Sequence, residues 1–188
     1  MDETTLNSGS VFSDHVVLYL DFLGVSDAAT SWPNDRAARL IDVLKTVAAA
    51  RASFDIDGAS QPDSSYKFNV AAETSTFSDH IVASYLIPEQ SDGLFEIVMG
   101  MYVSLACNMA SKIALHALDV GLLVRGGLTI GRLYHSEGVV FGEAMIDAHR
   151  LESTVAIYPR IAVSPRIVEK LSEVDRKKLL RKDTAPDS

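Results

Sequence analysis

The stretch His15–Leu23, HVVLYLDFL, decides the fold that we expect, because it places a single acid, Asp21, inside an otherwise apolar and β-branched run. Such a run, closed by Gly24, predicts a buried β-strand. An unpaired carboxylate in a buried strand costs several kcal/mol of desolvation, so Asp21 needs a partner. The strand therefore carries either a charged site or a salt bridge at its C-terminal end.

A second acid, Asp79, stands at a predicted hairpin turn. Residues Tyr66–Thr74 and His80–Ile87 predict the two strands of that hairpin. If the first strand is central in the sheet, Asp21 and Asp79 converge at one edge. Two like charges repel each other unless a divalent cation lies between them, and oxygen ligands favour Mg²⁺ or Mn²⁺. The spacing alone leaves open that Asp79 caps the turn and that Asp21 forms a salt bridge.

The remaining patterns predict helices that pack over one mostly antiparallel sheet, which is an α+β or α/β layer design. A length of 188 residues fits a single domain, which we place at residues 15–180 between a flexible N-terminus (1–14) and a charged tail (181–188). The other predicted elements are a helix from Pro33 to Phe54, a loop at 54–65, a helix at Leu94–Val120, strands at Gly121–Tyr134 and Gly138–Gly142, a helix at Glu143–Thr154, a strand at Arg160–Ser164 and a helix at Pro165–Leu180.

The helix at Leu94–Val120 raises the alternative of a membrane span, because Ile97–Ser111 carries no charge. A spanning helix needs about 20 apolar residues, and Glu96 and Lys112 bracket a shorter stretch than that. We therefore expect no membrane span. We expect instead a buried helix, covered by its own sheet on one face and by a second subunit on the other.

The net charge of −8 and the pI near 5.0 disfavour a nucleic acid as partner, because a nucleic-acid binder normally presents a basic face. An acidic protein can still bind a nucleoside triphosphate when metal cations supply the positive charge. The only cysteine, Cys107, excludes a disulfide framework, and residues 1–14 lack the pattern of a signal peptide. These features predict a cytoplasmic protein.

Four segments resemble, in chain order, the motifs of class III nucleotide cyclases. They are Leu20–Ser26 (LDFLGVS, the first metal motif), Phe77–Asp79 (FSD, the second metal aspartate), Val124–Gly131 (VRGGLTIG, the fourth strand) and Phe141–Gly142 followed by Ala148–Glu152 (AHRLE). The resemblance spans residues 15–164. It implies an α+β, class III cyclase-like fold with a ferredoxin-like core.

By this resemblance, Asp21 and Asp79 ligate two divalent cations, Mn²⁺ or Mg²⁺, assisted by the backbone carbonyl of Phe22. Arg150 would stabilise charge on the α-phosphate across a homodimer interface. The implied reaction is attack of the ribose 3′-hydroxyl on the α-phosphorus, with pyrophosphate leaving. From the residues alone, Arg150 also fits a solvated helix arginine paired with Glu143 or Asp147. Arg125 fits either a triphosphate ligand or a surface cation.

Two positions depart from the ordinary cyclases. Ile146 stands where many members carry an asparagine that assists the transition state, and Ser75 stands near the base-selecting position of the hairpin. With the compact single domain and the Arg-Gly-Gly strand, these departures make the chain similar to the bacterial pyrimidine cyclases of Pycsar antiphage defence. That resemblance implies UTP or CTP as substrate, and a cyclic UMP or cyclic CMP product read by a separate effector protein.

Between the two bases we favour uracil, because no acceptor cluster for the cytosine amino group is evident. Two alternatives stay open at this stage: a purine cyclase making cyclic AMP or cyclic GMP, and an inactive cyclase-like module for dimerisation or nucleotide sensing. The histidines show no ligand spacing, so we interpret all of them as structural or solvated: His15, His80, His116, His135 and His149.

Overall fold

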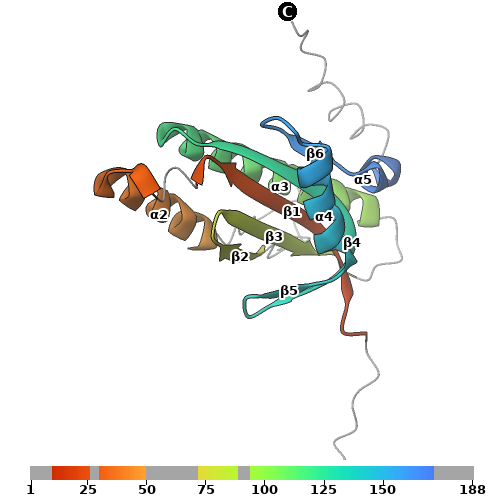
Figure 1. The fold of residues 1–188 in the computed structure, drawn as a ribbon. Helices are drawn as coiled ribbons and strands as arrows, with labels where there is room; N and C mark the ends of the chain where they lie inside the picture. The colour runs from red at the N-terminus through yellow and green to blue at the C-terminus, as the bar shows by residue number, and fades with distance from the viewer. Residues whose placement is uncertain (1–9, 26–29, 50–71, 89–93, 172–188) are drawn as a thin grey trace, which may run out of the picture.

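The computed structural model describes residues 10–25, 30–49, 72–88 and 94–171. Its centre is a sheet in the order β2-β3-β1-β4-β5, with β6 paired to β4, so β1 lies in the middle (Figure 1). The strands are β1 (Ser13–Leu23), β2 (Glu73–Phe77), β3 (His80–Leu86), β4 (Leu123–Ser136), β5 (Val139–Phe141) and β6 (Ile161–Val163).

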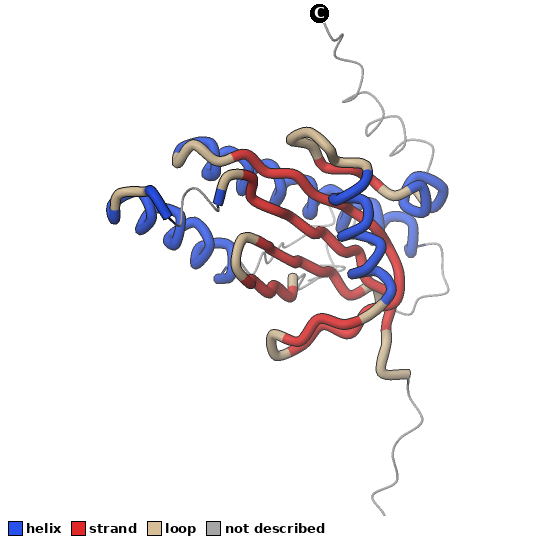
Figure 2. The backbone as a smooth tube through the Cα atoms, in the orientation of Figure 1, coloured by secondary structure: helices blue, strands red, loops and turns tan. Residues whose placement is uncertain are grey.

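The sheet is mixed and mostly antiparallel, as predicted. Strand β1 runs antiparallel to both β3 and β4, and β6 is the parallel member, paired with β4 at Gly126–Leu128. Strand β5 pairs with the far end of β4 at Tyr134–Ser136, so the β4–β5 hairpin extends as an arm (Figure 2). The fold is α+β.

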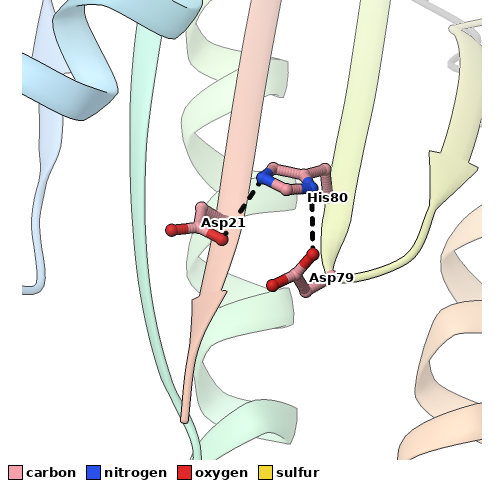
Figure 3. A group of neighbouring side chains, drawn as sticks. All are labelled: Asp21, Asp79 and His80. Atoms are coloured by element: carbon pink, nitrogen blue, oxygen red, sulfur yellow. Dashed lines mark ion pairs between the residues drawn. The ribbon is translucent and has the colours of Figure 1, made fainter. Parts of the chain in front are cut away.

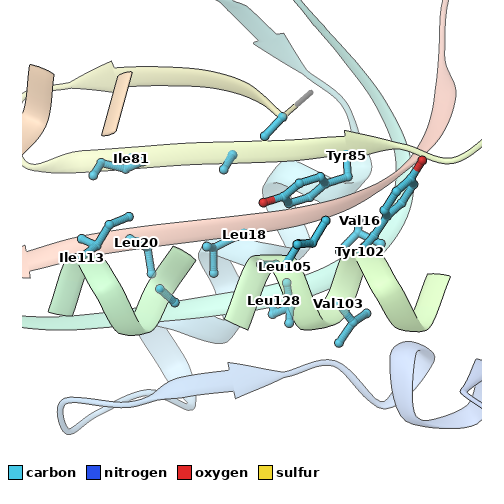
Figure 4. Packing of buried hydrophobic residues seen from close by; sticks show 14 of the residues in the cluster. Val16, Leu18, Leu20, Ile81, Tyr85, Tyr102, Val103, Leu105, Ile113 and Leu128 are labelled. Carbon is cyan, nitrogen blue, oxygen red and sulfur yellow. The ribbon is translucent and has the colours of Figure 1, made fainter. Parts of the chain in front are cut away.

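Alternation along β1 assigns its side chains to two layers, because successive residues of a strand face opposite sides. Val16, Leu18 and Leu20 belong to the main hydrophobic cluster with α3 (Leu94–Asp119), as Figure 4 shows. Val17 and Tyr19 face the other side, where they pack with Ala144 and Ala148 of α4 (Glu143–Thr154). Asp21 follows Tyr19 on that second face. The described helices also include α2 (Asn34–Ala49) and α5 (Pro165–Lys170).

Helix α3 is long and apolar enough to pass for a membrane span over Val98–Asp119, with a mean hydropathy of 1.3. Length and composition are weak evidence here, because the core helix of a globular domain meets the same criteria. Ala106, Ile113 and Ala117 of this helix are buried in the main hydrophobic cluster. The contacts of α3 with β1 and β4 account for its apolar face.

Most predicted elements are present, and the ends of two of them, α5 and β2, differ from the prediction. Helix α5 ends at Lys170 rather than Leu180, because Leu171 adopts an extended backbone with ψ of 145°. Strand β2 reaches Phe77 rather than Thr74, since it pairs with β3 as far as His80. Helix α2 is described as far as Ala49. Parts of these predictions, at residues 50–71 and 172–188, lie outside the described residues, as does the predicted loop at 54–65.

Strand β1 begins at Ser13, inside the range predicted as a flexible N-terminus, because Ser13 and Asp14 pair with Leu133 and Arg132 of β4. Residues 1–9 and the predicted charged tail lie outside the described residues.

Candidate metal and nucleotide site

The two aspartates predicted to converge lie side by side at one end of the sheet. The register of β1 and β3 sets Asp21 opposite His80, directly after Asp79 of the hairpin turn. The Phe22 amide donates a hydrogen bond of 3.0 Å to the Asp79 carbonyl oxygen, which holds the turn against β1. The left-handed Ser78, with φ of 55°, completes this tight turn. Backbone geometry therefore places both carboxylates.

His80 lies between the two acids, as Figure 3 shows. Its Nδ1 is 3.0 Å from Asp79 Oδ1, and its Nε2 is 3.5 Å from Asp21 Oδ1. Its ring stacks on Phe77 with centroids 5.3 Å apart and packs against Tyr19 at 5.4 Å. The interpretation of His80 as merely structural or solvated therefore needs correction. The missed signal is its position next to Asp79, opposite Asp21 in the register.

These side chains fit a divalent cation. Asp21, Asp79 and His80 each offer one ligand atom, and those atoms all lie within 4.8 Å of one another. Carboxylate oxygens suit Mg²⁺ and Mn²⁺, and the added imidazole nitrogen is a donor better suited to a transition-metal ion. Phe22 has a buried side chain in the main core, and the ligand role of its carbonyl oxygen stays a prediction.

Arg125 is a second partner of Asp21, besides His80. Both its Nε and its Nη2 lie 2.9 Å from Asp21 Oδ2, and its Nε lies 2.5 Å from Glu152 Oε1. The Nε hydrogen is directed at Asp21, so the Glu152 contact is an ion pair without hydrogen-bond geometry. The sequence left open whether Arg125 binds a triphosphate or is a surface cation. In the structure it bridges two acids, Asp21 of β1 and Glu152 of α4.

Glu152 is an almost fully buried acid, 2% exposed, for which the sequence assigned no role. Burial raises its pKa, and Asp21 raises it further, while Arg125 acts in the opposite direction. A sequence signal for it exists, because Ala144, Ala148 and Glu152 recur every four residues and form the buried stripe of α4. An acid on such a stripe needs a buried cation as partner.

Gly127 lets α4 approach the sheet closely enough for that contact. A Cβ at this position would overlap the backbone carbonyl of Ala148 and lie 2.9 Å from Leu151 Cβ. Gly127 is two residues from Arg125 on β4, and Ala148 is one helical turn before Glu152. The predicted Arg-Gly-Gly strand and the AHRLE segment therefore meet at the point where the acid and the arginine pair.

Tyr19 lies beside the site and packs between His80 of β3 and His149 of α4. Its ring contacts His80 and, edge to face at 5.3 Å, His149. Burial raises its pKa further above the ordinary value, and the nearby carboxylates of Glu152 and Asp21 add to that effect. The phenol therefore stays protonated, and its ring packs between the two histidines.

Arg150 lies outside this cluster. Its side chain is 69% exposed and its Nη1 is 3.6 Å from Asp147 Oδ1 of the same helix. Ile146, one turn earlier, is also exposed, so α4 presents Ile146 and Arg150 on its outward stripe. Within a single chain the structure brings together Asp21, Asp79 and Arg125, and it leaves Arg150 on the surface.

Ser75 lies on β2, on the same face of the sheet as the acids, and is 9% exposed. Its Oγ is 2.9 Å from Nε2 of His135, a residue of the β4–β5 arm. The other ring nitrogen of His135, Nδ1, is 2.8 Å from Oγ of the fully buried Ser84. The predicted base-selecting serine is thus one end of a set of three hydrogen-bonded side chains, Ser75, His135 and Ser84. Residue patterns do not predict these contacts, because Ser75, Ser84 and His135 lie on three different strands.

The same fold occurs in solved structures of nucleotide cyclases. The chain is similar to a bacterial light-regulated adenylyl cyclase (14% identity, TM-score 0.51, covering 83% of this chain and 78% of that one). It is also similar to the catalytic core of a rhodopsin-guanylyl cyclase with converted specificity in complex with ATPαS (16% identity, TM-score 0.54, covering 85% of this chain and 80% of that one). A third similar structure is the guanylyl cyclase Cya2 (13% identity, TM-score 0.52, covering 86% of this chain and 80% of that one).

No protein family profile matches the sequence, and no curated protein matches it either. At these identities the structural likeness defines the fold, which is that of class III adenylyl and guanylyl cyclase catalytic domains. On this fold, Asp21, Asp79 and His80 form a cluster suited to a divalent cation.

Proposed function

We propose that the chain is a pyrimidine nucleotide cyclase that converts UTP, and less readily CTP, to the 3′,5′-cyclic monophosphate and pyrophosphate. The observation that supports this proposal most directly is the convergence of Asp21 and Asp79, with His80, at one end of a cyclase-type sheet. We further propose that the enzyme acts in the cytoplasm, in antiphage defence, and that a separate effector protein reads its product.

The residues of the chain divide the work as follows. Asp21 and Asp79 would hold two divalent cations, Mn²⁺ or Mg²⁺, with the Phe22 carbonyl oxygen as an additional ligand. When bound, the cations lower the pKa of the ribose 3′-hydroxyl and neutralise the triphosphate. Arg125 lies beside Asp21, from where its guanidinium can turn towards a phosphate oxygen. Tyr19 and Phe77 pack around His80 and limit its movement.

The active enzyme would be a homodimer with composite sites. The side chain of Arg150 is exposed and pairs with Asp147 rather than with Asp21 or Asp79 of its own chain, which supports a role towards the α-phosphate held by the partner subunit. Several large apolar side chains are exposed on β2, β5 and α4 and in the segment after α4, and such side chains suit an interface. They are Phe77, Val139, Phe141, Ile146, Ile157 and Tyr158.

Two positions support the pyrimidine preference because they lack the side chains that many cyclases carry there: Ser75 at the base-selecting position and Ile146 at the position of the transition-state asparagine. Ser75 is short and bonded to His135, so it cannot extend along a purine edge as a lysine can. Ile146 offers no hydrogen-bond donor to the transition state, so Arg150 would carry that stabilisation without the usual asparagine.

The experiment is to incubate the purified chain with each of the four ribonucleoside triphosphates and Mn²⁺, and to separate the products by chromatography. We expect cyclic UMP as the main product and cyclic CMP as the minor one. A cyclic purine nucleotide as main product would establish the purine alternative. If no triphosphate gave a cyclic product while the chain still bound Mn²⁺, the inactive sensing or dimerisation module would replace the enzyme.

A further inference from the structure

A cavity of about 330 Å³ lies at the end of β1 that is opposite to Asp21, and His15 is one of the residues that line it. His15 follows the alternation of Val17 and Tyr19 along β1, so its side chain is on the face of the sheet that carries α4. Six residues separate His15 from Asp21, which is about 20 Å at the rise of a β-strand. Ser75 is not among the described residues that line the cavity. The cavity is therefore separate from the acids and from the predicted base-selecting position.

Four strands supply the polar side chains of this cavity. They include Ser13 and His15 of β1, Glu73 of β2, Ser84 of β3 and His135 of β4. The register places Glu73 directly opposite Ser84. Because β3 lies between β1 and β2, the backbones at His15 and Glu73 are at least about 10 Å apart, which is two strand spacings. A ligand that contacts both side chains therefore needs a polar group at each end.

The cavity carries negative charge. Burial and, to a smaller extent, the neighbouring His135 lower the pKa of His15 to about 4, against an opposing effect of Asp14. Burial also lowers the pKa of His135, so both imidazoles are neutral near pH 7. No lysine or arginine is among the lining residues that the structure describes, which leaves Glu73 as the charged one. The cavity therefore favours a cation and repels phosphate and carboxylate groups.

The two histidines differ in what they leave for a ligand. Both ring nitrogens of His135 already meet hydroxyls, Ser75 Oγ at 2.9 Å and Ser84 Oγ at 2.8 Å. The ring of His15 is 6% exposed and makes no hydrogen bond within the described part of the chain, and its Nδ1 is a buried atom without a partner. Buried polar groups are nearly always paired, and a neutral imidazole has one donor and one acceptor nitrogen. A ligand hydroxyl, which both donates and accepts, suits either tautomer of His15.

A metal ion does not fit this cavity. Within the described residues, a group of three ligand atoms that lie within 4.8 Å of one another occurs at Asp21, Asp79 and His80, and no such group includes His15 or Glu73. A short aliphatic chain with a polar group at each end fits better, because it reaches two side chains that lie on different strands.

We propose that this cavity binds a small organic cation that carries a hydroxyl group, with the ammonium at Glu73 and the hydroxyl at His15. The apolar Leu86 and Leu133 of the lining contact the aliphatic part of the ligand. The proposal does not rest on the proposed function, since it concerns a second site of the chain.

The test uses three four-carbon probes with polar groups at both ends: aminobutanol, butanediol and hydroxybutyrate. Protein labelled with ¹⁵N at histidine is titrated with each probe at pH 7, and the ring signal of His15, assigned by its loss in His15→Leu, is followed by NMR. We expect a saturable shift with aminobutanol, at least about tenfold tighter binding than with butanediol, and the weakest binding with hydroxybutyrate. A cavity that holds only water would give no saturable shift with any probe. That result, or tightest binding of hydroxybutyrate, would overturn the proposal.

Two variants test the role of Glu73. Glu73→Gln keeps the size of the side chain and removes its charge, so the affinity for aminobutanol should fall about tenfold, to near that for butanediol. Glu137→Gln is the matched control, because Glu137 is an exposed acid at the β4–β5 turn and does not line the cavity. It should leave the affinity unchanged. Equal losses in both variants would mean that the probe responds to the overall charge of the protein, and the site would be rejected.

A competition experiment separates this cavity from the nucleotide site. The affinity for aminobutanol should be the same with and without UTP and Mn²⁺, because the cavity lies about 20 Å from Asp21 along β1. Competition between aminobutanol and UTP would place the amine in the nucleotide site and overturn the proposal. None of these measurements needs turnover, so a chain that cyclises no triphosphate would refute the proposed function and leave this test intact.

Discussion

Arg125 Nη2 lies 2.9 Å from Asp21 Oδ2, so the acid proposed as a metal ligand already has a cation of the chain beside it. The same guanidinium touches Glu152, which is buried on α4. One arginine therefore balances two acids from different elements, and a divalent cation would add charge to a cluster that is already partly neutralised.

Removing that arginine is expected to destabilise the fold in a way that metal reverses. In Arg125→Ala, Asp21 and Glu152 face each other without a cation, which costs about 3 kcal/mol of the free energy of unfolding. Mn²⁺ should then raise the melting temperature more in the variant than in the wild type. Thermal unfolding with and without Mn²⁺ measures this, and the double variant Arg125→Ala/Glu152→Gln should recover part of the loss. If Mn²⁺ raised the melting temperature equally in both proteins, Arg125 and the metal ion would not compete for Asp21.

The metal assignment is tested by single removal of each acid. Asp21→Ala and Asp79→Ala should each abolish turnover and weaken Mn²⁺ binding by calorimetry at least about tenfold, because each removes a charged oxygen ligand. Asp147→Ala on α4 is the matched control, since Asp147 pairs with Arg150 and Arg166 on the surface. It should leave Mn²⁺ binding unchanged. Near-normal activity of either acid variant would refute the assignment.

The composite dimer predicts complementation between two inactive variants. Asp21→Ala and Arg150→Ala damage different halves of each site, so a mixed dimer keeps one site with neither change. After co-refolding in equal amounts, activity should recover to about a quarter of the wild type, because about half of the dimers are mixed and each has one intact site. The readout is product formation before and after mixing. An Arg150 that acted within its own chain would give no recovery.

Close packing of α4 on Gly127 should be sensitive to a single methyl group. Gly127→Ala forces a Cβ into the carbonyl of Ala148, and we expect a loss of about 2 kcal/mol or more in the free energy of unfolding. Gly131→Ala is the matched control on the same face of β4, because its nearest contact is the flexible Glu143 carboxylate at 3.3 Å. Chemical denaturation compares the two, and similar losses would contradict the role of Gly127.

The buried histidines predict acid sensitivity. Burial lowers the pKa of His15 from 6.5 to about 4, with a further contribution from His135 and an opposing one from Asp14. Between these pH values the unfolded chain binds a proton at His15 and the folded chain does not, so stability is lost as the pH falls from 6.5 towards 4. Above pH 6.5 this group has no effect. The contribution is up to about 3 kcal/mol.

His15→Leu removes that titration, so its free energy of unfolding should vary less with pH over this range. Denaturant unfolding at a series of pH values gives the comparison. Identical pH profiles for variant and wild type would show that His15 is solvated in the folded protein.

The sequence by itself determined the elements and the local placement of the acids. The run His15–Leu23 predicts a buried strand with Asp21 at its end, and the hairpin pattern sets Asp79 at a turn, because both signals depend on near neighbours in the chain. The α+β class follows from the order of such elements. Boundaries at Phe77 and Lys170 were missed, since pairing and packing decide where an element stops.

Only the tertiary structure decided the partners of these residues. His80 joins Asp21 through strand register, Arg125 meets Glu152 through the approach of α4 at Gly127, and Ser75 is tied to His135 by the fold of the β4–β5 arm. Each of these contacts links residues from different elements, and hydrophobic periodicity carries no information about such pairs. The acid in the first strand was thus predictable from the chain, and the cation beside it was not.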